Sequence, residues 1–430
     1  MTEKTSLPTP TRRYLPMWNH VKGKRSAVTC ALKCTNACLE PDANCSDNHY
    51  FKDIIEQAIS RRAMLGAAGA ALVVGAGATN APQAQAAVPA HAQGKGKALG
   101  RGAKDSAFSF EPIAPVPADV DDFIVPTGYE WDPIIRWGDP LFHDTPAFDV
   151  NNQIAAAQAR QFGFNNDYLT VIVDSKNPLR GVLVCNHEYV NENTMFPSEA
   201  WAADSGELRR VAMAAQGMSV VELRRTKVGS PWSYIVGGRR NRRITTDTPF
   251  SITGPAKGSK LLKTAADPTG AVVLGTNNNC SGGLTPWGTV LSGEENFDSY
   301  FVGKDTPEFK RYTIKNAPTP HGWEDADPRF NANNKGFENE SHRFGYIVEL
   351  DPENPSAPPR KHTALGRFKH EGANIHVDPV TGKVAAYMGD DSRFEYMYKF
   401  VSRDRYIEGN RKHNMTLLEN GSLLSLIHIS

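Results

Sequence analysis

Short strand-like segments separated by turn residues recur along most of this chain, and no other feature restricts its possible folds as strongly. They are rich in Val, Ile, Tyr and Phe, which favour β-strands. The segments occupy residues 168–174, 181–189, 219–225, 232–237, 288–297, 344–352, 383–391 and 396–402. No rhythm of strands alternating with long helices appears. The sequence therefore predicts an all-β fold with one or a few short helices, arranged as a sandwich, a barrel or a propeller.

Two stretches depart from the strand pattern. In SGELRRVAMAAQG, residues 205–217, apolar side chains recur at helical spacing, so we expect a helix that Ser205 caps and Gly217 ends. Its apolar positions are Leu208, Val211, Ala212 and Ala215. Residues 301–343 are polar, rich in Asn, Pro and Glu, and without periodicity. We expect a long structureless loop there, forming part of the rim of a site.

The charge balance excludes some classes of protein. The chain has 430 residues and a formal net charge of +1, so its global electrostatics point neither to nucleic acid nor to a membrane surface. Its 36 glycines and 29 prolines, against 22% charged residues, favour a turn-rich β fold over a helical bundle. We expect a monomer with no nucleic-acid partner and no stable membrane insertion.

An export signal is predicted near the N-terminus. Arg61 and Arg62 precede an uncharged stretch of mostly Ala, Gly and Val, and a small-residue A-Q-A site follows at 84–86. This order predicts a twin-arginine signal peptide at residues 60–87, recognised by the twin-arginine translocation machinery, behind a long leader at 1–59. The alternative, an Ala-rich buried helix, leaves the paired arginines unexplained.

The rest of the chain divides into a linker, a folded domain and a tail. Residues 88–109 are basic and rich in Gly and Ala, which predicts a flexible linker before a folded domain at 110–423. Residues 424–430, LSLIHIS, resemble a translated sequencing-library adaptor. We expect a non-native tail there, the alternative being an ordinary apolar strand. Four cysteines lie in the leader, where zinc ligands and reduced thiols of a discarded segment both remain open: Cys30, Cys34, Cys38 and Cys45.

Several strand-like segments end in side chains that can bind metal ions. The candidates are Cys185, Asn186, His187 and Glu188; Glu294, Glu295 and Asn296; His370, Glu371 and Asn374; and Asp390 and Asp391. In a radially repeating β fold such strand ends converge on one channel, where crowded carboxylates need cations to neutralise them. Carboxylate and amide oxygens suit Ca2+, while a thiolate suits iron or zinc, so we expect more than one type of metal.

Some of these candidates also have simpler explanations. Cys185 could form a disulfide with Cys280 after export. His187 and His370 are better explained as core histidines that brace neighbouring carboxylates than as ligands. The basic residues Arg367 and Lys369 could form a solvated face, but beside a carboxylate cluster an anion-binding role explains them better.

Long motifs in this chain resemble those of the PhoX family of alkaline phosphatases. They are SDNHYFKDIIEQAISRR, VCNHEYV, NNCSGGLTPWGTVLSGEENF and GRFKHEGANIHVDPVTGKVAAYMGDDSRFEYMYKFVS, within a likeness that runs from about residue 45 to about 423. The resemblance implies a six-bladed β-propeller that hydrolyses phosphate monoesters at a cluster of Fe3+ and Ca2+. It implies that Cys185 bridges iron, and that Glu371 and one of Glu294 and Glu295 bind metal.

The same resemblance implies that a basic residue of the stretch 367–369, Arg367 or Lys369, contacts phosphate. Two features of this chain depart from the family pattern. Ser292 and Gly293 stand where a cysteine is more often expected, which leaves Cys280 without an obvious role. Family chains also continue beyond this C-terminus, so we expect an incomplete propeller and an inactive, aggregation-prone product.

The function expected from these features is that of an exported metal-dependent phosphomonoesterase. It would release phosphate from small phosphate esters in the periplasm or outside the cell, for phosphate acquisition. Two alternatives remain: a calcium-dependent propeller that hydrolyses lactones or other esters, and a non-catalytic propeller that only binds. Calcium without iron would favour the first alternative, and full metal occupancy without hydrolysis would favour the second.

Overall fold

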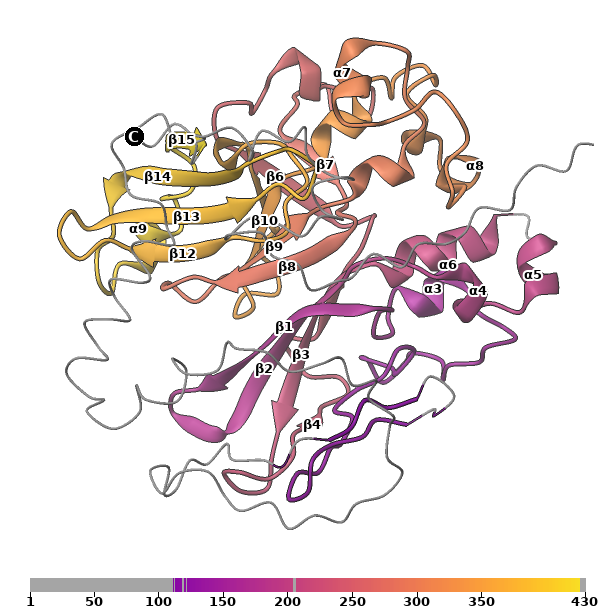
Figure 1. Ribbon diagram of the computed structural model, residues 1–430, viewed down its shortest axis with the longest axis vertical. Coiled ribbons are helices and arrows are strands. Elements are labelled where there is room, and N and C mark those ends of the chain that lie inside the picture. The colour runs from indigo at the N-terminus through magenta and orange to yellow at the C-terminus, as the bar shows by residue number, and fades with distance from the viewer. Residues whose placement is uncertain (1–110, 112, 118–119, 121, 204–205, 426–430) are drawn as a thin grey trace, which may run out of the picture. The chain divides into compact units, whose positions relative to one another are not determined.

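The computed structural model describes residue 111 and the ranges 113–117, 120, 122–203 and 206–425. The predicted leader, signal peptide and linker, with the four cysteines at 30–45, and residues 426–430 lie outside this part of the chain. The described residues belong to one compact unit, and their strands form three mostly antiparallel sheets (Figure 1). Within them, no helix has the length and apolar character needed to cross a bilayer.

The first sheet follows the chain order β1-β2-β3-β4, with β5 also paired to β3. Its strands are β1 Asn166–Asp174, β2 Asn177–His187, β3 Gly217–Arg224, β4 Ser233–Tyr234 and β5 Arg242–Ile244. Between β2 and β3 the chain forms α4 Glu192–Met195, α5 Ser198–Ala202 and α6 Glu207–Ala215, which lie with α3 Ala155–Gln158 beside one end of the sheet (Figure 1). Both β2 and β3 are buried along most of their length, so this sheet has a core on each face.

The second sheet has the strand order β7-β6-β11-β10-β9-β8. Its strands are β6 Pro249–Thr253, β7 Val272–Leu274, β8 Asn279–Leu284, β9 Val290–Glu294, β10 Ile347–Leu350 and β11 Arg360–His362. All its pairings are antiparallel except that of β11 with β6, which is parallel. The sheet therefore joins segments more than a hundred residues apart in the chain.

The third sheet is an antiparallel ladder in chain order. Its strands are β12 Asn374–Val377, β13 Lys383–Gly389, β14 Met397–Arg405 and β15 Gly421–Ser425, and α9 Arg411–Asn414 lies between the last two. Leu424 and Ser425, the first two residues of the expected tail, complete β15 by pairing with Lys399 and Tyr398. These two residues thus form an ordinary strand end.

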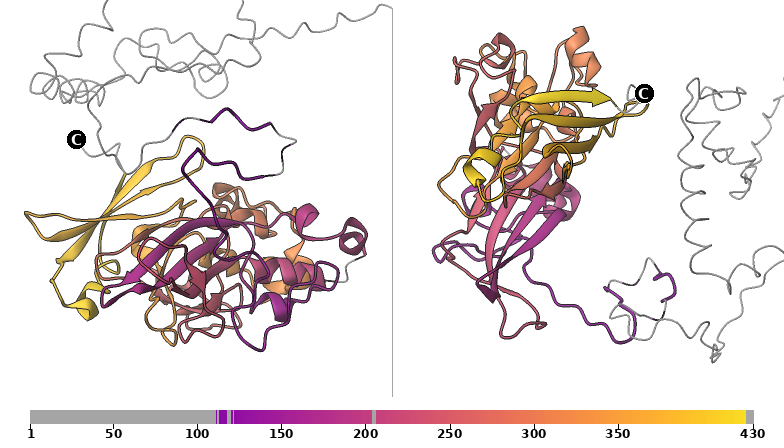
Figure 2. Two further views of the ribbon diagram at one scale, coloured as in Figure 1. Left: turned by 90° about the horizontal axis from the view of Figure 1, so that it is seen from below. Right: turned by 90° about the vertical axis from the view of Figure 1, so that its left-hand side faces the viewer.

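The three sheets meet at β8, which contacts both β1 and β12. In Figure 1, β8 runs between the magenta strands of the first sheet and the yellow strands of the third. Figure 2 shows from two other sides that the yellow strands stay grouped at one margin of the fold. One apolar core lies between the first and second sheets and includes Val182, Val220 and Phe250, and a second between the second and third sheets includes Leu291 and Phe400.

This architecture confirms the prediction of a mostly β chain with a few short helices. Each of the strand-like segments expected from the sequence coincides with or overlaps a strand. The described residues contain no closed barrel. A propeller, and the number of its blades, remains a proposal.

The predicted helix at 205–217 forms as α6 and buries the expected Val211, Ala212 and Ala215. Ser205 lies outside the described residues. Gly217 follows the C-cap Gln216 with a φ of +97°, the left-handed conformation in which glycine commonly ends helices. A Cβ atom there would lie 2.0 Å from the carbonyl oxygen of Ile244, so only glycine fits at this turn into β3.

Residues 301–343 are not the structureless loop that their polar composition predicted. They form α7 Pro307–Arg311, α8 Trp323–Ala326 and the 3-10 turns η4 Pro328–Phe330 and η5 Glu340–Arg343. Phe309, Trp323 and Phe330 are buried in the core between the first and second sheets. The expected structureless loop was wrong because a few aromatic side chains, widely and irregularly spaced in the sequence, anchor the segment in the core.

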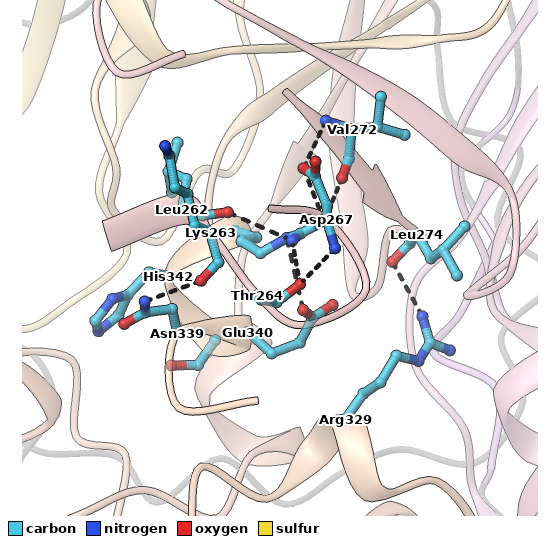
Figure 3. Close-up of polar contacts among 12 residues, drawn as sticks. Leu262, Lys263, Thr264, Asp267, Val272, Leu274, Arg329, Asn339, Glu340 and His342 are labelled. Atoms are coloured by element: carbon cyan, nitrogen blue, oxygen red, sulfur yellow. Dashed lines mark hydrogen bonds and ion pairs between the residues drawn. The ribbon is translucent and has the colours of Figure 1, made fainter. Parts of the chain in front are cut away.

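Buried polar contacts also fasten this segment to the second sheet. The Arg343 guanidinium donates to the hydroxyl of Thr264 at 2.9 Å and lies 3.8 Å from the Asp267 carboxylate. Arg329 donates to the carbonyl oxygen of Leu274 at 3.3 Å. Figure 3 shows these contacts around Thr264, Asp267 and Arg329. Because a buried guanidinium must satisfy its donors, the segment has one favoured position.

Candidate functional site

Acidic side chains gather where several strands end at the same place. Glu188 directly follows β2, Glu295 directly follows β9, and Asp391 lies just beyond β13. Asp167 lies near the start of β1, which is antiparallel to β2 and therefore begins where β2 ends. Glu371 precedes β12, and its backbone amide donates to the carbonyl oxygen of Gly389 at the end of β13.

One thiol lies among these carboxylates. Ligand atoms of Asp167, Glu188 and Cys280 all lie within 4.8 Å of one another, and so do those of Cys280, Glu295 and Glu371. Cys280 belongs to both groups, so its sulfur has a position from which a thiolate could bridge two cations. We call Asp167, Glu188, Cys280, Glu295 and Glu371 the acidic cluster.

Cys280 lies on β8 and is buried, and it is a free thiol. The side-chain amide of Asn186 donates to its backbone carbonyl oxygen at 2.5 Å, which joins β8 to the end of β2. Burial, then the charges of Glu295 and Glu188, raise the pKa of the Cys280 thiol. A bound cation would reverse this effect, because it favours the thiolate.

The carboxylates of the cluster are difficult to ionise together. Burial, then the charges of Asp167 and Glu371, raise the pKa of Glu188 to about 7. Burial and a hydrogen bond with the Asp391 side chain raise the pKa of Glu295 to about 8. The pKa of Glu371 is raised too, by burial and then by Asp391 and Asp167. Such mutual effects are typical of a site that cations complete.

Cys185, which the family resemblance predicts as the metal-binding thiol, is not among the clustered ligand atoms of the described residues. Its side chain packs with Leu141 and Phe162 on one face of the first sheet, whereas Val182 and Val184 face the second sheet. Burial raises the pKa of the Cys185 thiol to about 12. Cys185 and Cys280 are both free, so the alternative of a disulfide between them is not observed either.

Glu294, one of the two glutamates between which the sequence could not decide, is also outside the cluster. Its carboxylate accepts a hydrogen bond from Lys361 Nζ at 2.6 Å and one from the Thr276 hydroxyl at 2.8 Å. The backbone amides of Gly345 and Tyr346 donate to its other oxygen at 3.0 and 3.1 Å. Of the Glu294–Glu295 pair, Glu295 is therefore the member that the structure places among the other ligand atoms.

The two predicted phosphate-binding cations have different positions. Lys369 Nζ lies 2.9 Å from Asp298 Oδ1 and 3.2 Å from Asn296 Oδ1, next to Glu295. Arg367 donates instead to the carbonyl oxygens of Phe344 at 2.8 Å and Ser341 at 2.9 Å.

The Arg367 guanidinium also stacks over the ring of Tyr312, 3.9 Å from its centroid. This placement favours Lys369 as an anion contact and a packing role for Arg367.

His187 and His370 are buried, as expected of core histidines, but the hydrogen bonds found for their rings go to Ser219 and to the carbonyl oxygen of Gly366 and not to carboxylates. His187 Nε2 shares a hydrogen bond of 2.7 Å with the Ser219 hydroxyl, and His370 stacks on Phe368 with ring centroids 3.6 Å apart. Burial lowers the pKa of His370 to about 3 and that of His187 well below its usual value. Among the other candidates, Asn186 braces β8, and the backbone amide of Asn296 donates to Asn278 Oδ1 at 2.6 Å.

Sequence reasoning missed Asp167 and left Cys280 without a role. Asp167 opens β1 in a polar stretch, FNND, that looks like a turn. The antiparallel hairpin could have indicated Asp167, because the start of β1 must lie beside the end of β2, where Glu188 lies. For Cys280 the signal was its position in NNNCSGG, across the strand pair from the glutamates that end β9.

The residues present fit metal ions of two kinds. Four carboxylates suit a hard cation such as Ca2+, and a thiolate among them suits a transition ion such as iron. The buried side-chain oxygen of Asn186, on the residue that braces Cys280, has no hydrogen-bond partner in the described part of the chain. An unpartnered buried oxygen on the residue that braces Cys280 is a feature that a cation explains.

Comparisons with known proteins identify the family of this chain. The model of the family "Alkaline phosphatase PhoX" matches residues 108–427. A solved structure, Pseudomonas fluorescens PhoX in complex with vanadate, a transition state analogue, is 42% identical with a TM-score of 0.66, covering 70% of this chain and 52% of the other. This chain thus spans about half the length of that relative, and no curated protein matches it. With most of its length matched by the family model, the chain belongs to the PhoX family of alkaline phosphatases.

Proposed function

We propose that this protein is a metal-dependent phosphomonoesterase. The observation that carries the proposal is the acidic cluster, in which one buried thiol is shared by two groups of carboxylates. Membership of the PhoX family and 42% identity to a PhoX solved in complex with vanadate support phosphate-ester chemistry at this cluster. Phosphoryl transfer depends mainly on positioning and on charge neutralisation, and a cluster of this composition suits both.

The residues of the cluster divide by the ions they suit. Cys280, with Glu188 and Glu295 on either side, would hold Fe3+ through its thiolate. Asp167 and Glu371 are the more exposed carboxylates and would hold Ca2+, each together with the glutamate of its own group, Glu188 or Glu295. The bound cations would supply Lewis-acid neutralisation of the phosphoryl oxygens and activate water.

Lys369 is the residue that we assign to the substrate. Its ammonium group lies beside Asn296, the neighbour of Glu295, and Asp298 fixes its position. It would donate charge-assisted hydrogen bonds to phosphate oxygens that the cations leave free. Arg367 would position the segment that carries Lys369, since its donors are used by the carbonyl oxygens of Ser341 and Phe344.

The cellular location, the fold beyond the three sheets and the substrates are proposed as follows. Arg61 and Arg62 and the A-Q-A site support export by the twin-arginine machinery to the periplasm or beyond. The three sheets that meet at β8 are compatible with neighbouring blades of a six-bladed propeller. We propose small phosphate monoesters as substrates, phosphate acquisition as the purpose, and a monomeric state.

The test combines elemental analysis with an activity assay on the exported protein. We expect iron and calcium to copurify, p-nitrophenyl phosphate to be hydrolysed at alkaline pH, and vanadate to inhibit. Calcium without iron, together with hydrolysis of lactones, would instead indicate the other enzyme class. Full metal occupancy without hydrolysis of any phosphate monoester would refute the proposed activity.

A further inference from the structure

The Glu294 side chain belongs to neither group of clustered ligand atoms in the described residues, yet its backbone adjoins two members of the acidic cluster. Glu295 follows it directly in the chain. The backbone carbonyl oxygen of Glu294 accepts a hydrogen bond of 3.2 Å from the amide of His370, the residue before Glu371. Whatever fixes Glu294 therefore fixes the backbone beside two candidate ligands that lie 76 residues apart in sequence (371 − 295).

The Glu294 side chain is fixed by a buried ion pair. Lys361 and Glu294 both have fully buried side chains, and Lys361 Nζ lies 2.6 Å from the carboxylate. Lys361 also donates to the carbonyl oxygen of Arg343 at 3.0 Å and lies 3.9 Å above the centroid of the Phe344 ring. With the Thr276 hydroxyl and two backbone amides, the carboxylate has four donors, so it has little freedom to move.

These contacts continue to the polar network of Figure 3. Arg343, whose carbonyl oxygen accepts from Lys361, uses its side chain to bind Thr264 and to approach Asp267. A buried ion pair is by itself weak evidence of a stability role, because desolvation can exceed the attraction. Its position beside the cluster suggests a reason other than stability.

We propose that Glu294 and Lys361 are positioning residues, which set the distance between the Glu295 and Glu371 carboxylates so that both reach one cation. The inference rests on the proposed function only in assuming that the cluster binds cations. Residues that support metal ligands from behind commonly change metal affinity when they are substituted, although they do not touch the ion.

Glu349 offers a matched control. It is also a buried glutamate with four donors: Trp287 Nε1 at 2.9 Å, the Thr289 hydroxyl at 2.5 Å, Arg360 at 2.6 Å and His362 at 2.7 Å. It pairs in register with Leu291, whereas Glu295 lies past the other end of β9. Glu349→Gln should therefore disturb the second sheet as much as Glu294→Gln does, but without reaching the cluster.

The experiment is calorimetric titration of Ca2+ into chelator-treated full-length protein, with thermal unfolding recorded for each variant. We expect Glu294→Gln to weaken Ca2+ binding by about 10- to 100-fold. Glu349→Gln should lower Tm by a similar amount and change the Ca2+ affinity by less than about twofold, because distant sites act independently. Equal Ca2+ affinity in Glu294→Gln and the wild type would overturn the inference, and so would equal losses in both variants.

A milder pair of variants applies if Glu294→Gln does not fold. Thr276→Val removes one donor to Glu294, and Thr289→Val removes one donor to Glu349. Only Thr276→Val should weaken Ca2+ binding, and an unchanged affinity would again contradict the inference. Wild-type protein that binds Ca2+ but hydrolyses no phosphate ester would refute the proposed function alone. Wild-type protein that binds no cation would refute both.

Discussion

Glu294 and Glu295 are neighbours in the chain, but their carboxylates lie in opposite environments. Glu294 forms a fully buried ion pair with Lys361 at 2.6 Å, while Glu295 reaches within 4.8 Å of ligand atoms of Cys280 and Glu371. Successive side chains of an extended chain point to opposite sides, so two adjacent glutamates cannot both enter one cluster. Of this acidic pair, Glu295 is thus a candidate metal ligand, and Glu294 fixes the backbone beside it.

Cys280→Ala should remove most of the iron and lower phosphatase activity at least a hundredfold, about 2.7 kcal/mol of barrier. The reason is that Cys280 is the one thiol among the clustered ligand atoms of the described residues. Elemental analysis and turnover of p-nitrophenyl phosphate measure the two effects.

Cys185→Ala is the matched control for this substitution. Its thiol packs among Leu141, Phe162 and other apolar side chains, so truncation should cost about 1 kcal/mol of stability. Iron content and activity should stay at the wild-type level. Loss of iron from Cys185→Ala with iron retained in Cys280→Ala would restore the assignment made from sequence.

Lys369→Ala should keep the metals and weaken phosphate binding by about tenfold or more, because the substitution removes a charge-assisted hydrogen bond. The ammonium group lies beside Asn296 and Asp298 but belongs to neither group of clustered ligand atoms. Inhibition by inorganic phosphate gives the change in affinity, and elemental analysis gives the metal content.

Arg367→Ala should show the opposite behaviour. It removes stacking on Tyr312 and two hydrogen bonds to backbone carbonyls, so Tm should fall. The inhibition constant for phosphate should change little in the protein that remains folded. Loss of metals in Lys369→Ala would show that this division of roles is incorrect.

The strands were predictable from sequence because each is a continuous run of residues with a strong local preference. The apolar segments at 168–174 and 181–189 became β1 and β2, with turn residues where the hairpin reverses. The helix α6 was equally clear from its apolar spacing. Local pattern fixed these elements, since neighbouring residues in the chain are also neighbours in space.

The members of the acidic cluster were less predictable, because their positions depend on which face of a strand meets another sheet. Cys185 stands in the more conspicuous motif, but its side chain lies on the face of β2 that packs against Leu141. Asn186 takes the other face and reaches Cys280. No local property of VCNHEYV separates these two orientations, because a shift by one residue reverses both.

Gly217→Ala should destabilise the protein by more than about 1 kcal/mol, since its φ is +97° and a Cβ would lie 2.0 Å from the Ile244 carbonyl oxygen. Gly229→Ala is the control, with a φ of +87° and no atom within 4 Å of a Cβ. Gly229→Ala should show only the cost of the left-handed backbone. Equal losses of unfolding free energy in both variants would mean that β5 can move away from the end of α6.

The last prediction concerns pH and metal removal. In the metal-free protein, the pKa of Glu188 is about 7 and that of Glu295 about 8, against 4.5 for an ordinary glutamate. At any pH between the ordinary pKa and the raised pKa values, the folded state binds more protons than the unfolded state does. Its free energy of unfolding must therefore fall as pH rises from the ordinary value through the raised ones.

Bound cations should abolish this pH dependence, because they favour the ionised carboxylates whose charges otherwise repel. Thermal unfolding from about pH 5 to about pH 9, with chelator and separately with Ca2+, measures both cases. We expect Tm to fall with pH only in chelator, and the fall to be smaller in Glu295→Gln, whose amide does not titrate. A metal-free Tm that stays constant or rises over this range would show that the carboxylates of the cluster do not destabilise one another, and the case for a cation there would lose its electrostatic basis.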